Sequence, residues 1–596
     1  MARRLSRHVS AFPPAMADGG YDAIVIGSGY GGGIAASRLA RSGLKVCVLE
    51  RGREMLPGAF PDRLSEAAAE TQISLGDKHI GRADALFDLR VGDDIHVLQG
   101  CGLGGTSLIN ANVCLKPDMR VFDDPVWPEA LRSDGLLAEG FARARQMLQP
   151  ETCPPTPAQA KLDALGTAAR HLGAELKRPP LHIKFETGPN AANVVQPACT
   201  FCGDCCGGCN VGAKTTTLNT YLADATAFGA HLYTGARVVS VAKANDGSWV
   251  VRCTAMPDGE KEAESGVAHL RTKIVVLAAG TLGTNEILLR SRQDGLSLSD
   301  RLGHGFTSNG DALATAYNND CVVNGVGVGH PYRADVPPVG PAVAGLIDLR
   351  GTEQPDDGTA IVEAALPSML APLLPASLVP GGALFGEAED RALGDQLDGI
   401  GRAFKSLVTG AYRGALHNTQ SFLAIGHDQA NGRMVLENDR VVVTWPGAAD
   451  QEVFQKIGAQ FAAAAAATGG TYIPNPMSHP MMGHALTTVH PLGGCAMGEN
   501  AETGVVNHAC EVFDGSGTAT HDGLYVCDGS VMPRSLGIHP LMTISAVAER
   551  AMLLFARIRQ YDVDMNLREG EPTAPLVAPP AAKPAPLPTS DRRVEG

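Results

Sequence analysis

Apolar and polar positions follow two different periods along this chain, and together they predict an α/β fold. Residues 21–26 and 44–49 are short apolar runs, while residues 30–42 between them place small and apolar residues at helical spacing up to Gly43. Continuous apolar runs next to glycine are typical of buried parallel strands. The segment therefore predicts a strand, a helix and a second strand, and KIVVLAAG at residues 273–280 predicts another strand of the same sheet.

The remaining pattern divides the chain into regions. Residues 231–241 and 248–256 alternate like half-buried strands of a small sheet. Residues 311–480 are less regular, and we expect the substrate domain there. The expected organisation is a disordered leader at 1–20, a nucleotide-binding domain at 21–310, the substrate domain at 311–480, a return to the first domain at 481–560, and a disordered Pro/Ala-rich tail at 571–596.

One stretch, residues 364–386, carries no charge and is long enough to suggest a membrane span. Four prolines interrupt it, at positions 367, 372, 375 and 380, and each removes a helical hydrogen bond. We therefore expect no transmembrane segment. A buried, proline-kinked segment and an apolar lid over a hydrophobic substrate are equally compatible with the pattern.

The glycines between the first strand and its helix complete a dinucleotide-binding fingerprint. Gly27, Gly29 and Gly32 permit a tight turn, a close approach of backbone to pyrophosphate, and packing of helix on strand. The N–H groups at the start of the helix then face the phosphates. Glu50 ends the second strand, where a carboxylate accepts hydrogen bonds from ribose hydroxyls. The complete unit, more than the glycines alone, predicts a dinucleotide.

The fingerprint does not by itself distinguish FAD from NAD. A second glycine pattern, at Gly325, Gly327 and Gly329, has neither a following helix nor an acid-ended strand. Enzymes that pass electrons between pyridine nucleotide and flavin need two nucleotide sites. A single site near the start of a long chain therefore predicts FAD that the substrate itself reduces.

Composition narrows the partners. The formal charge of −14 repels nucleic-acid phosphates, and no Lys/Arg-rich run offsets it. Nucleic-acid binding is therefore not expected. The first 20 residues show no export signal, and Met16 is an alternative start. Together with crowded cysteines that suit a reducing compartment, this predicts a cytoplasmic protein.

Three remote segments would have to return to the same cofactor. The turn GCGLGGTSLINAN, residues 100–112, allows backbone to lie against a planar ring, with Asn110 at the ring edge. The strand GLYVCDGS ends in Asp528, whose carboxylate suits a ribityl hydroxyl. A helix begins near Pro540, and its positive end would stabilise an anionic reduced flavin.

Two His-Pro dipeptides, His490-Pro491 and His539-Pro540, lie beside these segments. Oxidation of an alcohol removes a hydroxyl proton and a carbon-bound hydride, and a histidine is well suited to take the proton. One histidine would act as the base and the other would hold the substrate oxygen.

A cysteine cluster adds a metal hypothesis. Cys199, Cys202, Cys205 and Cys209 have the spacing of a bacterial ferredoxin, with Asn210 in place of the usual proline. No second run supplies the remaining thiolates of a two-cluster protein. An iron-sulfur cluster, a structural zinc ion and reduced thiols in a turn remain as alternatives. A cluster would give electrons an exit from the flavin and favour a dehydrogenase.

The sequence resembles the glucose-methanol-choline (GMC) oxidoreductases, and among them the cholesterol oxidase-like flavoenzymes. The resemblance is carried by GSGYGGG, GLGGTSLINAN, NVGAKTTTLNTYL, VVLAAGTLGTNEILLRS, HPLGGCAMG and GLYVCDGSVMPRSLGIHPLMTISAVAER. It implies the GMC fold, in which a Rossmann-like FAD-binding domain carries a smaller α+β substrate domain. It also implies FAD, bound noncovalently or, in some members, covalently.

The resemblance also assigns residues. His490 matches the base and His539 its partner, and the positions implied to lie near FAD are Tyr30, Gly31, Glu50, Gly105, Asn110, Val238, Asp528 and Gly529. Sterol-specific members often have Asn in place of His539, so the pair is more similar to the general His-His pair. Those members also isomerise a double bond with a glutamate. Glu363 is the nearest candidate, but its spacing differs, so oxidation is expected rather than isomerisation.

The expected function is FAD-dependent oxidation of a hydroxyl group on a hydrophobic alcohol, such as a sterol, to the carbonyl, which would place the protein in steroid metabolism. The hydride would pass to flavin, and oxygen or an electron-acceptor partner would reoxidise it. The alternatives are a dehydrogenase for another alcohol with a non-oxygen acceptor, a hydroxynitrile lyase-type enzyme in which the histidines do acid–base work alone, and a non-catalytic flavin-binding protein.

Overall fold

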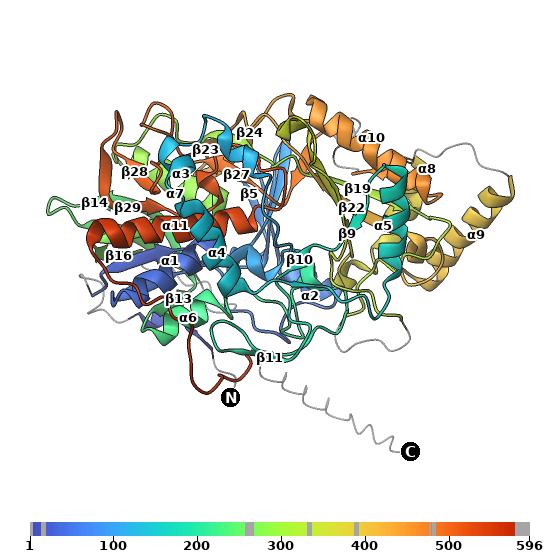
Figure 1. The fold of residues 1–596 in the computed structure, drawn as a ribbon, viewed down its shortest axis with the longest axis horizontal. Helices are drawn as coiled ribbons and strands as arrows, with labels where there is room; N and C mark the ends of the chain where they lie inside the picture. Colours follow the sequence, from blue (N-terminus) through green and yellow to red (C-terminus); the bar gives the residue numbers. More distant parts are fainter. Residues whose placement is uncertain are drawn as a thin grey trace, which may run out of the picture.

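The structure is a computed structural model that describes residues 4–12, 20–256, 267–329, 336–384, 386, 393–475, 478 and 484–578. Figure 1 shows two regions side by side. One contains the helices α1, α4, α7 and α11 around a mainly parallel sheet, and the other contains α5, α8, α9 and α10 around an antiparallel sheet.

A seven-stranded sheet forms the first region. Its strands, in spatial order, are β1 (Ser6–His8), β13 (His231–Thr234), β3 (Val46–Leu49), β2 (Ala23–Ile26), β17 (Ile274–Leu277), β29 (Thr520–Val526) and β28 (Glu511–Phe513). All neighbours are parallel except β28 and β29. The central strands β3, β2 and β17 are fully buried, which is why they read as uninterrupted apolar runs.

Helices are present in both regions. The described helices are α1 (Tyr30–Arg41), α2 (Leu64–Ala69), α3 (Glu129–Ser133), α4 (Leu136–Leu148), α5 (Ala160–His171), α6 (Tyr221–Ala227), α7 (Gly280–Gln293), α8 (Leu374–Leu384), α9 (Leu393–Thr409), α10 (Glu452–Ala467) and α11 (Leu541–Arg559). Helix α1 packs against α6 and α11, and α11 packs against α4. The C-terminal part of the chain thus returns to the N-terminal sheet.

The second region is built on a six-stranded antiparallel sheet. Its order is β25 (Thr471–Pro474), β19 (Ala312–Tyr317), β22 (Gln420–Ile425), β21 (Thr359–Ala364), β20 (Leu346–Leu349) and β9 (Leu176–Lys177). Residues of α5 and α10 pack on it in one apolar cluster. The sheet therefore also takes β9 and α5 from the segment before residue 311.

Smaller sheets and strand pairs complete the described structure. A five-stranded sheet has the order β26 (Leu486–Thr488), β7 (Ile95–Gly100), β6 (Phe87–Val91), β4 (Thr71–Leu75) and β5 (Lys78–Ile80), and a four-stranded sheet the order β24 (Arg440–Thr444), β23 (Gly432–Glu437), β18 (His304–Thr307) and β27 (Leu492–Gly494). A three-stranded sheet consists of β14 (Ala236–Lys243), β15 (Trp249–Ala255) and β16 (Val267–Thr272). Two pairs remain, β8 (Glu151–Thr152) with β10 (Pro180–Leu181) and β11 (Gly188–Pro189) with β12 (Val195–Gln196). Met434 and Val441, from the β23–β24 hairpin, belong to the core of the first region, although they lie inside the segment expected for the substrate domain.

Both ends of the chain differ from the expected disorder. In the leader, β1 pairs in parallel with β13, so residues 6–8 are part of the main sheet. In the tail, Thr573 exchanges backbone hydrogen bonds with residues 193 and 195, and Leu576 is buried. These interactions hold segments that have no apolar pattern of their own. Residues 1–3, 13–19 and 579–596 of the expected leader and tail lie outside the described residues.

The uncharged stretch 364–386 contains β21's last residue, a 3₁₀ turn and α8, which runs through Pro380. Helix α8 therefore continues through Pro380, whereas Pro367 and Pro372 lie outside the helix. Within the described part of the chain, no helix combines the length and the apolar character needed to cross a membrane.

Candidate active site

The glycine turn lies between β2 and α1, as expected. A Cβ atom on Gly31 would come within 1.3 Å of the carbonyl oxygen of Cys527, so only glycine fits where α1 meets the end of β29. Gly29, in contrast, has open space where its Cβ would be. Gly105 of the remote turn lies directly against Gly29. The turn is therefore packed tightly on one side and open on the side where a pyrophosphate would approach.

Glu50 ends β3 beside this turn. Its carboxylate accepts hydrogen bonds from the Ser28 hydroxyl (2.6 Å) and from the Gly52 N–H (2.8 Å). The same hydroxyl accepts from the Gly104 N–H (2.9 Å), so one serine joins the turn, β3 and the 100–112 segment. Burial raises the pKa of Glu50.

Val238 lies near Glu50, on β14. The Ala236 N–H donates to the Glu50 carbonyl oxygen, and the register of β14 against β15 shifts between Val238 and Ser240. Val238 itself pairs with Cys253 and Ser240 with Arg252, so Val239 is the residue that the bulge leaves unpaired in the ladder.

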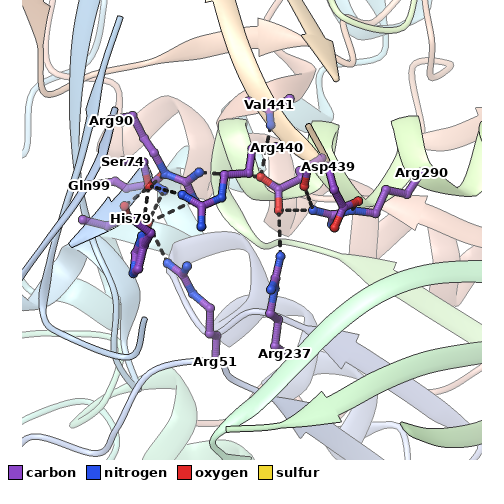
Figure 2. A network of polar contacts seen from close by, with 12 residues as sticks. Arg51, Ser74, His79, Arg90, Gln99, Arg237, Arg290, Asp439, Arg440 and Val441 are labelled. Carbon is purple, nitrogen blue, oxygen red and sulfur yellow. Dashed lines mark hydrogen bonds and ion pairs between the residues drawn. The ribbon is translucent and has the colours of Figure 1, made fainter. Parts of the chain in front are cut away.

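The residues next to these two positions belong to a polar network. Arg51 donates to Asp88 (2.7 Å), and Arg237 lies 3.6 Å from a carboxylate oxygen of Glu286, to which Arg290 also donates (2.6 Å). Figure 2 shows Arg51 and Arg237 entering this network from the same side. The network fixes the chain after Glu50 and before Val238.

Tyr30 and Asn110 form the second meeting point. The Asn110 side-chain amide donates to the Tyr30 hydroxyl (2.8 Å), whose oxygen also lies 3.3 Å from Nε2 of His182. Burial lowers the pKa of His182 to about 3, so its ring is neutral. Lys214 also fixes the backbone of the Asn110 segment, because its buried Nζ donates to the carbonyl oxygens of Leu108 (3.1 Å) and Asn110 (2.6 Å).

Asp528 and Gly529 lie where β29 ends. The Asp528 carboxylate accepts from the Ser530 N–H (2.9 Å) and hydroxyl (2.5 Å), and from the Gly280 N–H (3.0 Å) and Thr284 hydroxyl (2.5 Å) at the start of α7. The side chain thus joins two segments of the protein itself. From the sequence we expected this carboxylate to bind a ribityl hydroxyl, and its links between β29 and α7 were not expected.

Several buried polar atoms on the 100–112 segment and at the start of α11 have no partner among the described residues. They are Oδ1 of Asn110, both side-chain polar atoms of Asn112, both ring nitrogens of His539 and the hydroxyl of Thr543. Unpaired buried polar atoms are costly in a finished fold. They lie on two segments, residues 100–112 and 539–543, that the sequence assigned to the cofactor or substrate. Together with the open space at Gly29, they show that the residues present fit FAD.

His490 lies between β26 and β27 and is anchored by a residue that the sequence did not single out. Its Nδ1 is 2.8 Å from Oδ1 of Asp311, whose side chain is fully buried. Nε2 of His490 has no hydrogen-bond partner within the described ranges. The ring is therefore held by one nitrogen and free at the other.

His539 lies beside His490 but in a different environment. The two rings meet edge to face, with centroids 5.1 Å apart and an interplanar angle of 80°. Burial, then the proximity of His490 and of Arg350, lowers the pKa of His539 well below its usual value. The structure thus brings the two predicted histidines together, one anchored by a carboxylate and one neutral with both nitrogens available.

The residues that position this pair were not predicted. Asn309 accepts from the Leu536 N–H (2.7 Å) and donates to the Ile538 carbonyl (2.8 Å), on the loop before His539. Both Asn309 and Asp311 lie in the short turn between β18 and β19. No local pattern links this turn to residues so distant in sequence.

The four cysteines of the expected metal site line a small pocket together with Lys214. All are free thiols. Over the described residues, no group of three or more His, Cys, Asp or Glu side chains is arranged to hold a metal ion. The structure therefore does not support the iron-sulfur or zinc interpretation of Cys199, Cys202, Cys205 and Cys209.

The segment is shaped by contacts with the second region instead. The Ala342 N–H donates to Sγ of Cys205 (3.4 Å), and the Asp204 carboxylate accepts from the N–H groups of Gly329 (2.7 Å) and Ser368 (2.6 Å). The thiols thus pack in a turn between the two regions.

Glu363, the residue considered as an isomerising base, is fully buried in the core. Its carboxylate forms an ion pair with Lys161 at 3.0 Å, both side chains being buried, and it accepts from the N–H groups of Ala344 (2.7 Å) and Gly345 (2.9 Å). A fully engaged carboxylate does not reach a substrate. The structure therefore excludes this residue as the isomerising base.

Comparison with known sequences agrees with the geometry. Two family models described as GMC oxidoreductase match residues 21–307 and 435–548. The chain is 28% identical to a cholesterol oxidase of Mycobacterium tuberculosis, with 93% of each chain covered, and 26% identical to one of Acinetobacter baumannii, with 89% and 94% covered. It is 23% identical to the long-chain-alcohol oxidase FAO4B of Arabidopsis thaliana, over 88% of this chain and 66% of that one.

Solved structures show the same fold. Pyridoxine 4-oxidase from Mesorbium loti matches with a TM-score of 0.56 at 16% identity, covering 90% of this chain and 99% of that one. A fungal aryl-alcohol oxidase matches with a TM-score of 0.52 at 16% identity, covering 91% and 99%. The chain belongs to the GMC oxidoreductase family, FAD-binding flavoproteins that act on CH–OH groups.

Proposed function

We propose that the protein oxidises a hydroxyl group of a hydrophobic alcohol, a sterol or a long-chain alcohol, to the carbonyl, with His490 as the base. The observation that carries this proposal is the His490–Asp311 hydrogen bond at 2.8 Å, which leaves Nε2 of His490 as the free nitrogen next to His539. The substrate class comes from the cholesterol oxidases and long-chain-alcohol oxidases that the chain is similar to.

In this proposal, FAD would be held by residues from five segments of the chain. They are Gly27, Gly29, Tyr30, Gly31, Gly32, Glu50, Gly105, Asn110, Val238, Asp528 and Gly529. The open side of the turn at Gly29 suits the pyrophosphate, and Glu50 suits the adenosine ribose. Bound FAD supplies the acceptor for the hydride that leaves the alcohol carbon.

The histidines divide the remaining work. Nε2 of His490 takes the hydroxyl proton, because Nδ1 is occupied by Asp311. His539 stays neutral, since its pKa is lowered by burial, and donates a hydrogen bond that holds the substrate oxygen. The bond between that oxygen and its proton breaks as the carbon–hydrogen bond breaks, so the product is a ketone or an aldehyde.

An anaerobic titration tests this function. Sterols, long-chain alcohols and polyols are added separately to the FAD-loaded protein, and the flavin absorption band is followed. We expect bleaching by apolar alcohols and none by polyols. A flavin that no alcohol bleaches, in a protein that acts on a cyanohydrin, would indicate the hydroxynitrile lyase alternative. A flavin with neither activity would indicate a binding protein.

The acceptor is tested on the same sample. Admission of oxygen to the bleached protein restores the yellow colour and releases peroxide if oxygen is the acceptor, as the names of the similar oxidases suggest. A flavin that stays reduced in oxygen but is reoxidised by a quinone would identify a dehydrogenase.

A further inference from the structure

The turn Ser308–Asp311 contacts the supports of both histidines. Asp311 binds His490, and Asn309, two residues earlier, binds the loop that carries His539. The Asn309 and Gly310 backbones adopt positive φ angles of 60° and 66°, which turns the chain sharply before β19 begins at Ala312. We call residues 308–311 the clamp turn.

The two oxygens of Asp311 have different tasks. Oδ2 accepts from the Thr488 hydroxyl (2.8 Å) and from the N–H groups of Val489 (2.9 Å) and His490 (3.0 Å). Within the described residues, the hydrogen-bond partner of Oδ1 is Nδ1 of His490. One oxygen therefore holds the backbone of the histidine segment, and the other faces its ring.

A carboxylate only accepts hydrogen bonds, so Nδ1 of His490 must be the donor in this pair. In a neutral imidazole one nitrogen carries the proton and the other accepts one. The proton on Nδ1 therefore makes Nε2 the acceptor. Because Asp311 is buried and held by three further donors, water does not replace it.

We propose that Asp311 is a positioning residue that fixes His490 in the Nδ1-protonated tautomer, so that Nε2 is always ready to take the substrate proton. This inference rests on the proposed function, in which His490 is the base. It adds a residue that acts through His490 and does not touch the substrate.

The substitution Asp311→Asn separates this role from support of the fold. Three donors face Oδ2, so the amide oxygen of asparagine takes that position and keeps those hydrogen bonds. The amide NH₂ group then faces Nδ1 of His490. Since NH₂ only donates, it forces the opposite tautomer, with the proton on Nε2. The fold is kept while the base is disabled.

Asp428→Asn is the matched control. Asp428 is also buried and also holds the clamp turn, accepting from the Ser308 hydroxyl (2.8 Å) and the Gly310 N–H (2.9 Å). It forms no hydrogen bond with His490 or His539 among the described residues. The Asp428 variant therefore shows how much of the rate is lost when a buried carboxylate that contacts the clamp turn is replaced.

The experiment measures the anaerobic rate of flavin reduction, the dissociation constant of the alcohol, and the low-field proton resonance of an imidazole N–H bound to a carboxylate. For Asp311→Asn we expect a rate lower by about 10²–10⁴-fold, a dissociation constant changed by less than about threefold, and loss of the resonance. Asp428→Asn should keep the resonance and a rate within about threefold of the original.

Equal rate losses in the two variants, or a rate in Asp311→Asn within threefold of the original, would overturn the inference. If Asp311→Asn does not fold, spectra of the original protein and His490→Ala decide, because a low-field resonance absent from both also overturns it. The proposed function fails separately: an unchanged rate in His490→Ala would remove the base itself, whatever the Asp311 variant does.

Discussion

The two His-Pro dipeptides have the same sequence and opposite surroundings. His490 has 14% of its side chain exposed and receives a buried carboxylate from a turn 179 residues away. His539 is 4% exposed and has no partner for either ring nitrogen within the described chain. Identical local sequence therefore does not specify a role. The role depends on what remote segments place against each ring.

The difference also separates two ways of tuning an imidazole. At His490 a carboxylate selects which nitrogen carries the proton. At His539 burial, followed by the proximity of His490 and Arg350, disfavours the charged form of the ring. One ring is prepared to gain a proton during the reaction and the other to remain neutral throughout.

The largest effect is expected when His490 is removed. His490→Ala should lower the anaerobic rate of flavin reduction by roughly 10³-fold or more, because a general base contributes about 10²–10⁴-fold. FAD content, read from the ratio of flavin to protein absorbance, should not change. Reduction at the original rate would mean that the two histidines do not differ in the assigned way.

A smaller effect is expected at His539. His539→Ala should lower the rate about 10–100-fold, since it removes one hydrogen bond to the substrate oxygen and leaves a cavity. His539→Asn retains a donor and should lose less. The two rates are compared in the same stopped-flow experiment. An asparagine variant slower than the alanine variant would contradict a hydrogen-bonding role.

A change in the clamp turn should sharpen the contrast. Asn309→Asp places an oxygen against the Ile538 carbonyl, where the amide now donates at 2.8 Å. We expect a rate lower by several-fold and a loss of about 1–3 kcal/mol in the free energy of unfolding, measured by denaturant titration. A larger rate loss than in Asp311→Asn would show that the His539 loop, not the His490 ring, is the more sensitive.

The smallest expected effect is on how the free energy of unfolding depends on pH. The pKa of His539 is depressed in the folded protein, so the unfolded chain binds a proton that the folded chain does not as the pH falls below about 6.5. Stability should therefore fall with decreasing pH, with up to about 1.4 kcal/mol per pH unit from this group. His539→Asn should reduce that slope between pH 6.5 and 5, measured by denaturant titration at each pH. An unchanged slope would contradict the depressed pKa.

The sequence predicted those parts of the site that are local. The strand, glycine turn, helix and Glu50 lie in one continuous segment, so their apolar period and spacing were sufficient. The pairing of the two histidines followed from their shared context and the family resemblance. Asp311 could not be predicted, because only the fold of β18 and β19 carries it to His490.

The cysteine spacing left three interpretations open, and the structure does not support the two that need a metal. A ferredoxin-like spacing predicts a metal when the chain can wrap around it. Here Asp204 and Cys205 accept backbone hydrogen bonds from residues 329, 368 and 342. These distant partners determine how the segment folds, and spacing contains no information about them.

The N-terminal strand protects one edge of the main sheet. Strand β1 covers β13, which would otherwise be the edge of the main sheet. Ser6 of β1 and the preceding Leu5 also supply their N–H groups to the buried carboxylate of Glu54. A chain translated from Met16 would lack both, leaving an uncapped row of backbone donors and acceptors beside apolar side chains. Such an edge is a template for strand pairing between molecules, so the shorter chain should aggregate more readily than the full one.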